Sequence, residues 1–311
     1  MERVAVKRFE PGVETFLDSC KPGTRRTYAA AYLAFEEFSG ESVLDFLRRA
    51  EEDMKKEGLN KSHVARTTLA DFVKWLGSKK RANKTVRAYV GAIQGLAKYY
   101  DLRIGASYIN LPPSTTIHKK HPWTIEEIGN FISQMDHTLY KSMAATIVQS
   151  GLSLADLLML KYGDIQEEFE KGITPLCLDL TRKKTSVPFL TFIGKWGVSL
   201  LKEHLNGKHL TDKTPIYDVC DRAVHGYFRR YARKFGGKIK PRNPYTPHSL
   251  RAAFRTILSD HQIDHIIIEF WMGHSVPEQQ IVYVSKSREG WRETYRTLAE
   301  PWLTPPQFSR L

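Results

Sequence analysis

The side chains of this chain that are best suited to chemistry occur together late in the sequence. They are His248, Arg251, His274 and Tyr283; His274 follows Arg251 by 23 residues, and Tyr283 follows His274 by 9. A phenol that attacks a phosphodiester produces negative charge on the non-bridging oxygens, which a planar guanidinium binds in pairs. Histidine titrates near neutral pH, so it can hold a phosphate oxygen or move a proton. This set predicts phosphoryl transfer with Tyr283 as a covalent nucleophile.

These residues lie in motifs that resemble those of a known family. The chain reads His-Ser-Leu-Arg over 248–251, Met-Gly-His-Ser over 272–275 and Gln-Gln-Ile-Val-Tyr over 279–283. The tyrosine recombinases, also called phage-type integrases and Xer-like recombinases, carry His-x-x-Arg, Leu-Gly-His and a tyrosine in the same order. The chain resembles this family, and its segment 269–280 is most similar to archaeal members.

One position of the family's upstream motif differs here. Residues 147–165 are similar to the pattern Thr-Gly-Leu-Arg-x-Ser-Glu-Leu, but Ser153 replaces the first catalytic arginine, while Asp156 occupies the place of a supporting acid. Loss of one such contact costs about 3 kcal/mol or more of transition-state stabilisation. Three explanations are open: a compensating cation, a natural protein that only binds DNA, or an engineered change. The candidate compensating cations are Lys161, Lys183 and Arg255.

A predicted β-hairpin carries the next candidate. Residues 176–180 and much of 187–193 alternate apolar and polar, and the turn between them reads Thr-Arg-Lys-Lys-Thr-Ser. The resemblance implies that a lysine of this hairpin protonates the departing 5′ oxygen. Lys184, which precedes Thr185, fits the family's Lys-Thr pattern best, and Lys183 is second.

The charge balance favours a nucleic-acid partner. The chain has 47 Lys and Arg against 34 Asp and Glu, a formal net charge of +13 and a pI near 9.5, which suits a long phosphate surface. It has no apolar run long enough to cross a membrane and no signal-peptide core, so we expect a cytoplasmic, nucleoid-associated protein. The cysteines are far apart, and no cluster has metal-ligand spacing, so we expect neither disulfides nor a metal.

Two domains are expected at this length. Residues 1–105 are predicted to form a helical core-binding domain that contacts DNA, and 106–121 a linker rich in helix breakers. Residues 122–311 would form the catalytic domain with a C-terminal oligomerisation segment. The first domain should contain four helices, with Thr24 capping one of them. The expected DNA contacts are Arg25, Arg26, Lys84, Arg87, Lys183 and Arg255.

The catalytic domain is expected to be mixed. Apolar spacing predicts helices over residues 125–135, 139–160, 198–204 and 222–235 around the hairpin, so the fold class is mainly α with a small β-hairpin. In family members a C-terminal helix docks on the neighbouring protomer. Its expected anchors here are Trp291, Leu298 and Trp302, and Tyr295 is a rival nucleophile.

The resemblance implies a site-specific DNA recombinase that needs neither metal nor ATP. Two proteins would bind each recombination site of double-stranded DNA, and a homotetramer would join two sites; the free protein would be a monomer or weak oligomer. Tyr283 would form a 3′-phosphotyrosine, and the released 5′ hydroxyl would attack the partner duplex through a Holliday junction. The alternatives are an impaired DNA-binding accessory protein and a type IB topoisomerase-like enzyme that nicks and rejoins DNA.

Overall fold

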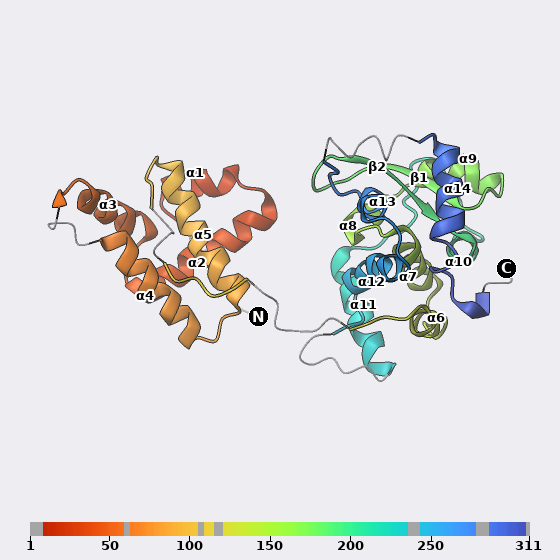
Figure 1. The fold of residues 1–311 in the computed structure, drawn as a ribbon, viewed down its shortest axis with the longest axis horizontal. Coiled ribbons are helices and arrows are strands. Elements are labelled where there is room, and N and C mark those ends of the chain that lie inside the picture. Colours follow the sequence, from red (N-terminus) through yellow and green to blue (C-terminus); the bar gives the residue numbers. More distant parts are fainter. Residues whose placement is uncertain are drawn as a thin grey trace. The chain divides into compact units, whose positions relative to one another are not determined.

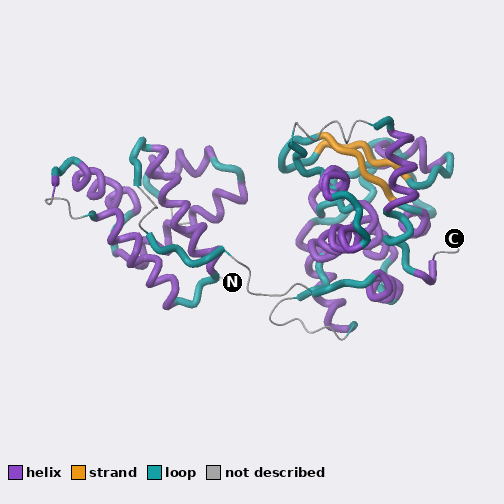
Figure 2. Tube along the Cα trace, in the orientation of Figure 1, coloured by secondary structure: helices purple, strands orange, loops and turns teal. Residues whose placement is uncertain are grey.

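The chain folds into two compact units, Met1–Lys119 and Lys120–Leu311. The computed structural model describes residues 9–58, 63–104, 109–114, 121–235, 243–277 and 286–308. Both units are mainly helical, and the strands within these ranges form one small hairpin (Figures 1 and 2). The fold class is therefore as predicted, and the division between the units falls inside the predicted linker. None of the described helices is both long and apolar enough to cross a membrane.

The first unit is built on five helices in its described part, where the sequence predicts four. They are α1 (Pro11–Ser19), α2 (Pro22–Ser39), α3 (Val43–Met54), α4 (Val64–Ser78) and α5 (Asn83–Tyr99). The unpredicted α1 has nine residues and buries only Val13 and Leu17, too few for a clear periodic signal. The expected Thr24 cap is wrong, because α2 starts at Pro22 after Lys21.

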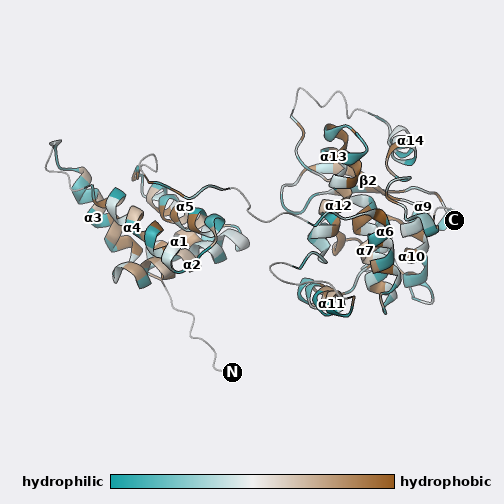
Figure 3. Cartoon of the chain, turned by 60° about the horizontal axis from the view of Figure 1, so that its bottom comes forward, coloured by the Kyte–Doolittle hydropathy of each residue, from teal (hydrophilic) through white to brown (hydrophobic). Residues whose placement is uncertain are grey.

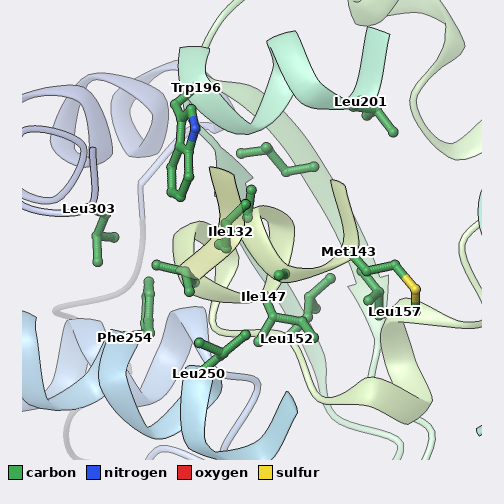
Figure 4. Packing of buried hydrophobic residues seen from close by; sticks show 14 of the residues in the cluster. Ile132, Met143, Ile147, Leu152, Leu157, Trp196, Leu201, Leu250, Phe254 and Leu303 are labelled. Carbon is green, nitrogen blue, oxygen red and sulfur yellow. The ribbon is translucent and has the colours of Figure 1, made fainter. Parts of the chain in front are cut away.

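The second unit surrounds a buried central helix. Its elements are α6 (Ile125–Ser133), α7 (Thr138–Ser150), α8 (Leu154–Leu157), α9 (Gln166–Glu170), β1 (Leu176–Thr181), β2 (Pro188–Ile193), α10 (Lys195–Leu205), α11 (Asp221–Lys234), α12 (Pro247–Asp260), α13 (His265–Trp271) and α14 (Arg288–Leu298), with short 3-10 turns at Tyr162–Asp164 and Pro306–Phe308. Every residue of α7 from Ser142 onward is buried, and α10, α12 and β2 pack against this helix. Figure 4 shows Ile147 of α7 among Leu250 and Phe254 of α12.

The hairpin packs against this core at one side of the second unit. β1 and β2 pair antiparallel, with Leu176 opposite Ile193 and Thr181 opposite Pro188. Strand β2 contacts α7, α13 and α14, so the buried strand face is covered by helices. Figure 3 shows that hydrophobic residues gather where the elements of each unit face one another.

The helix predicted over residues 139–160 is wrong as a single element, because it breaks at Gly151. The backbone there has φ of +65°, and a Cβ at this position would lie 2.7 Å from the ring of Phe254. Glycine adopts this left-handed conformation without steric cost and leaves room for the ring. The break starts a new helix at Leu154 and turns the carbonyl of Gly151 toward α12, where it accepts a hydrogen bond from Arg251.

The C-terminal helix packs on its own chain. Trp291, an expected contact to a neighbouring protomer, is fully buried and stacks on Phe270 with ring centroids 4.9 Å apart. The other two expected anchors, Leu298 and Trp302, are partly exposed. Trp291 therefore belongs to the core of this unit.

Candidate active site

Arg251 joins three segments of the second unit that are distant in sequence. It lies in the second turn of α12, which Thr246 caps by accepting a hydrogen bond from the Ser249 N–H. Arg251 is 6% exposed. Its Nη1 donates to the carbonyl of Gly151, and its Nη2 donates to that of Met272 at 2.9 Å. The arginine thus links the α7–α8 turn to the end of α13.

The charge of Arg251 is poorly compensated. Burial, together with the nearby charge of Arg182, lowers the pKa of its guanidinium to about 10, against weaker opposing effects of Asp156 and Glu269. Arg251 stays protonated at neutral pH, and none of the ion pairs among the described residues involves it. A buried cation whose hydrogen-bond partners are neutral favours an incoming anion, because the anion offsets its lost hydration.

His274 is held in one tautomer between a donor and an acceptor. Its Nε2 lies 3.0 Å from Nη2 of Arg251, and its Nδ1 lies 2.5 Å from Oε2 of Glu269. A guanidinium can only donate, so Nε2 accepts and the proton sits on Nδ1. Burial lowers the pKa of His274, and the charges of Arg251 and Arg182 add to this, although Glu269 acts in the opposite direction. The imidazole is therefore neutral at pH 7.

This lowered pKa makes the protein sensitive to acid. The unfolded state takes up a proton near the ordinary value of 6.5 and the folded state does so only at lower pH, so stability is complete above 6.5 and is lost as the pH falls. We expect urea unfolding to show a steeper loss of stability below about pH 6.5 for the wild type than for His274→Gln. The glutamine amide can still accept from Arg251 and donate to Glu269. Parallel pH profiles would contradict this assignment.

The second candidate histidine lies one turn earlier on α12. His248 is exposed in the first turn of the helix, three residues before Arg251. Side chains three apart on a helix leave the same face. The helix thus presents an exposed imidazole next to the buried guanidinium.

Ser153 is used to start α8. Its Oγ accepts a hydrogen bond from the Asp156 N–H at 3.3 Å and donates to Asp156 Oδ2 at 2.6 Å. The other carboxylate oxygen of Asp156 accepts from the backbone N–H of Lys183 at 3.0 Å. Asp156, at the expected place of the supporting acid, therefore fastens the tip of the hairpin to α8. Ser153 itself brings no charge to the site.

A residue that the sequence did not single out enters the site from the hairpin. Nη1 of Arg182 donates to the carbonyl of Gly273 at 3.0 Å. Gly273 has φ of +67°, and a Cβ there would lie 2.9 Å from the ring of Phe189, so the turn requires glycine. The family's Lys-Thr pattern draws attention to Lys184. The only sequence signal for Arg182 was its place in the basic turn.

No hydrogen bond among the described residues joins the side chain of Lys161, Lys183 or Arg255, the three compensating cations named from the sequence, to Arg251. Arg255 forms an ion pair with Glu269 at 3.0 Å and contacts His265. The backbone at Lys161 pairs with Pro215 in an isolated bridge. Lys183 and Lys184 are exposed at the hairpin tip, while Tyr283 lies outside the described residues.

The rival nucleophile is excluded by burial. Tyr295 is fully buried, and its hydroxyl donates to the carbonyl of Gln149 at 2.7 Å. Burial raises the pKa of this phenol well above its ordinary value. Tyr295 therefore has neither access to DNA nor an accessible phenolate.

Two of the four DNA contacts expected in the first unit come together. Arg26 of α2 and Lys84 of α5 line one shallow pocket with Tyr89. Arg25 instead pairs with Glu14 and Asp18 at 3.0 and 3.1 Å. Arg87 donates to the carbonyl of Pro112 at 3.2 Å. The two helix starts thus form one basic surface, which we call the α2–α5 patch, defined by Arg26 and Lys84.

Comparison with known proteins identifies the family. Residues 123–289, more than half of the chain, match the model of the phage integrase family. The chain belongs to this family. It is a tyrosine recombinase, and thus of a class of DNA strand transferases.

The relatives of this recombinase match different shares of the chain. The tyrosine recombinase XerC of Chlamydia caviae is 21% identical over 307 residues, which cover 90% of this chain and 93% of that protein. XerD of Ralstonia nicotianae is 23% identical over 152 residues, 48% of this chain, and the match spans about half of that protein, 49%. A crystallised lambda integrase (75–356) dimer bound to a COC′ core site has a TM-score of 0.57 at 15% identity, covering 88% of this chain and 93% of that one. The last likeness is one of fold.

Proposed function

We propose that this recombinase cleaves and rejoins double-stranded DNA at a specific site, with Tyr283 as nucleophile. The observation that carries the proposal is the setting of Arg251. Its guanidinium is buried without a carboxylate partner, and it is hydrogen-bonded to His274 and to the turn that precedes Ser153. Three motifs, whose bonded residues run from Gly151 to His274, thereby meet at a site that favours an anion.

The proposed reaction conserves the bond energy. The Tyr283 hydroxyl loses its proton to solvent as its oxygen attacks the scissile phosphorus, the P–O5′ bond breaks, and the DNA 3′ end becomes a phosphotyrosine. Lys184 donates a proton to the departing 5′ oxygen. Arg251 neutralises charge on the non-bridging oxygens, and His248 and His274 contact the same group. Attack by a 5′ hydroxyl reverses the step, so neither ATP nor an external nucleophile is consumed.

The proposed assembly follows from the need to exchange strands between two duplexes. Two recombinases bind each site, and a tetramer joins two sites and passes through a Holliday junction, while the free protein is a monomer or weak oligomer. Residues 1–105 form the core-binding domain, whose α2–α5 patch faces phosphates, and 106–121 the linker. Lys183 and Arg255 add contacts from the catalytic domain. The lambda integrase neighbour is a dimer bound to its core site, which supports the binding of two proteins to each site. The protein would act in the cytoplasm, on the DNA of the nucleoid.

A covalent-trapping experiment tests the proposal. The wild type is incubated with a suicide substrate that carries its own attachment site and a nick beside the scissile phosphate. We expect a denaturation-resistant protein–DNA adduct, and Tyr283→Phe should lose it while keeping DNA affinity, because only the attacking oxygen is removed. Tyr295→Phe is the matched control and should keep the adduct. An adduct that survives Tyr283→Phe would refute the assignment of the nucleophile.

A binding-only role is the second candidate, and Ser153 is the observation that favours it. In that case the wild type would bind its site without forming an adduct, and Ser153→Arg would create one. Formation of four-way junctions, measured on native gels, separates recombination from topoisomerase-like relaxation.

A further inference from the structure

We propose that Arg182 is the second guanidinium of the phosphate site, in place of the arginine that Ser153 replaces. The inference rests on the proposed function, since it assigns a role within the same cleavage step. It makes Arg182 a catalytic residue that contacts a non-bridging oxygen of the scissile phosphate. A site with one guanidinium by sequence would then have two in the folded protein.

Ser153 cannot itself supply the missing positive charge. Ser153 has a short neutral side chain, and both hydrogen-bonding functions of its hydroxyl are used on Asp156. The segment that normally brings a cation toward the phosphate here brings a helix cap. The missing charge must therefore come from another element.

Arg182 and Arg251 are hydrogen-bonded to the same turn. Arg251 donates to the carbonyl of Met272 at 2.9 Å, and Arg182 donates to the next carbonyl, that of Gly273, at 3.0 Å. Both guanidinium groups are therefore held by adjacent residues of one turn. Consistent with this, the charge of Arg182 lowers the pKa of both Arg251 and His274.

Hydrogen bonds hold the backbone of Arg182 in place. Its N–H donates to the carbonyl of Val187 at 2.9 Å, and its own carbonyl accepts from the Ser186 N–H at 2.8 Å. The next residue, Lys183, is bonded through its N–H to Asp156 at 3.0 Å. The hairpin turn is thus held by its own backbone hydrogen bonds and fixed to α8, so the backbone that carries the half-buried Arg182 side chain has a defined position.

Arg182 has unused hydrogen-bond donors and, among the described residues, no counter-ion. A guanidinium has five N–H donors, and the Nε of Arg182 is buried without a hydrogen-bond partner. No ion pair within the described parts of the chain includes Arg182 or Arg251. Arg255, by contrast, is neutralised by Glu269. Two neighbouring cations, neither of which is in an ion pair among the described residues, match the charge that spreads over the oxygens of a phosphodiester under attack.

The test is a double-mutant cycle between positions 182 and 153, read as the rate of covalent adduct formation on the suicide substrate. Arg182→Gln should lower the rate about a hundredfold and change DNA affinity little. Adding Ser153→Arg to Arg182→Gln should recover about tenfold or more, whereas Ser153→Arg alone should gain little, because Arg182 already fills the role. Arg296→Gln, which removes an exposed arginine paired with Glu293, is the control for lost charge.

A substrate with a methylphosphonate at the scissile position separates a phosphate contact from a structural role. This linkage lacks the negative charge that a guanidinium neutralises, so the difference between wild type and Arg182→Gln should shrink by about tenfold or more. A structural defect would persist on both substrates. Additive effects in the cycle, or an undiminished difference on the methylphosphonate, would overturn the role of Arg182.

The outcomes also separate this inference from the proposed function. If the wild type and Arg182→Gln form the adduct equally fast, recombination chemistry stands and the role of Arg182 falls. If only Ser153→Arg variants form an adduct, Arg182 does not replace the missing arginine. If no variant forms one on its own site, the proposed function fails.

Discussion

Replacing Arg251 with methionine is expected to slow adduct formation about a thousandfold or more while leaving the folded state nearly as stable as the wild type. Loss of a guanidinium aimed at the developing charge removes transition-state stabilisation that a neutral side chain cannot supply. The same change relieves the folded protein of a buried cation without an acidic partner. This relief offsets the lost hydrogen bonds to Gly151 and Met272, so we expect the free energy of unfolding to change by about 1 kcal/mol or less.

Single-turnover cleavage and urea unfolding of the same preparations measure both parts of this prediction. Leu250→Ala, one residue earlier in α12 and fully buried, is the control and should show the opposite pattern. It should cost about 2 to 5 kcal/mol of stability and lose little activity at temperatures where it is folded. If Arg251→Met unfolds as easily as Leu250→Ala, the arginine is mainly a structural bridge. If it still cleaves DNA, the phosphate is bound elsewhere.

Much of the site could be predicted from the sequence because its chemistry lies in short local patterns. The hairpin follows from alternation on either side of a basic turn, and residues 176–180 fall within the observed β1, Leu176–Thr181. The spacing of His248 and Arg251 places them on one helix face. These signals depend on neighbours along the chain, so they survive without knowledge of the tertiary structure.

The features that the sequence did not predict depend on contacts between segments that are distant along the chain. The basic turn does not reveal which of its three cations faces the site, because that direction depends on the Asp156–Lys183 bond and on the turn at Gly273. No local pattern encodes either contact. The break at Gly151 has a related cause: apolar residues continue through it at helical spacing, and the glycine is necessary because of its left-handed backbone and the nearby Phe254 ring.

The burial of Trp291 also depends on contacts between distant segments, and its removal is expected to have a large effect on stability. Trp291→Ala should lower the free energy of unfolding of the monomer by about 3 to 5 kcal/mol. The indole is fully buried, stacked on Phe270 at 4.9 Å and edge-on to Trp271 at 6.1 Å, on a helix that packs against β2. Removing it leaves a large cavity that the surrounding aromatic rings cannot fill. Urea unfolding at low protein concentration measures this.

The matched variant is Trp302→Ala. Trp302 is 43% exposed and stacks on His261 with ring centroids 3.7 Å apart, so its loss should cost about 1 kcal/mol or less. A side chain that anchors a neighbouring protomer would behave differently from one in the core, because its removal would weaken tetramer assembly on DNA without destabilising the monomer. Such a result for Trp291 would mean that α14 leaves its own core during assembly. The same result for Trp302 would assign the exposed indole to the contact between protomers.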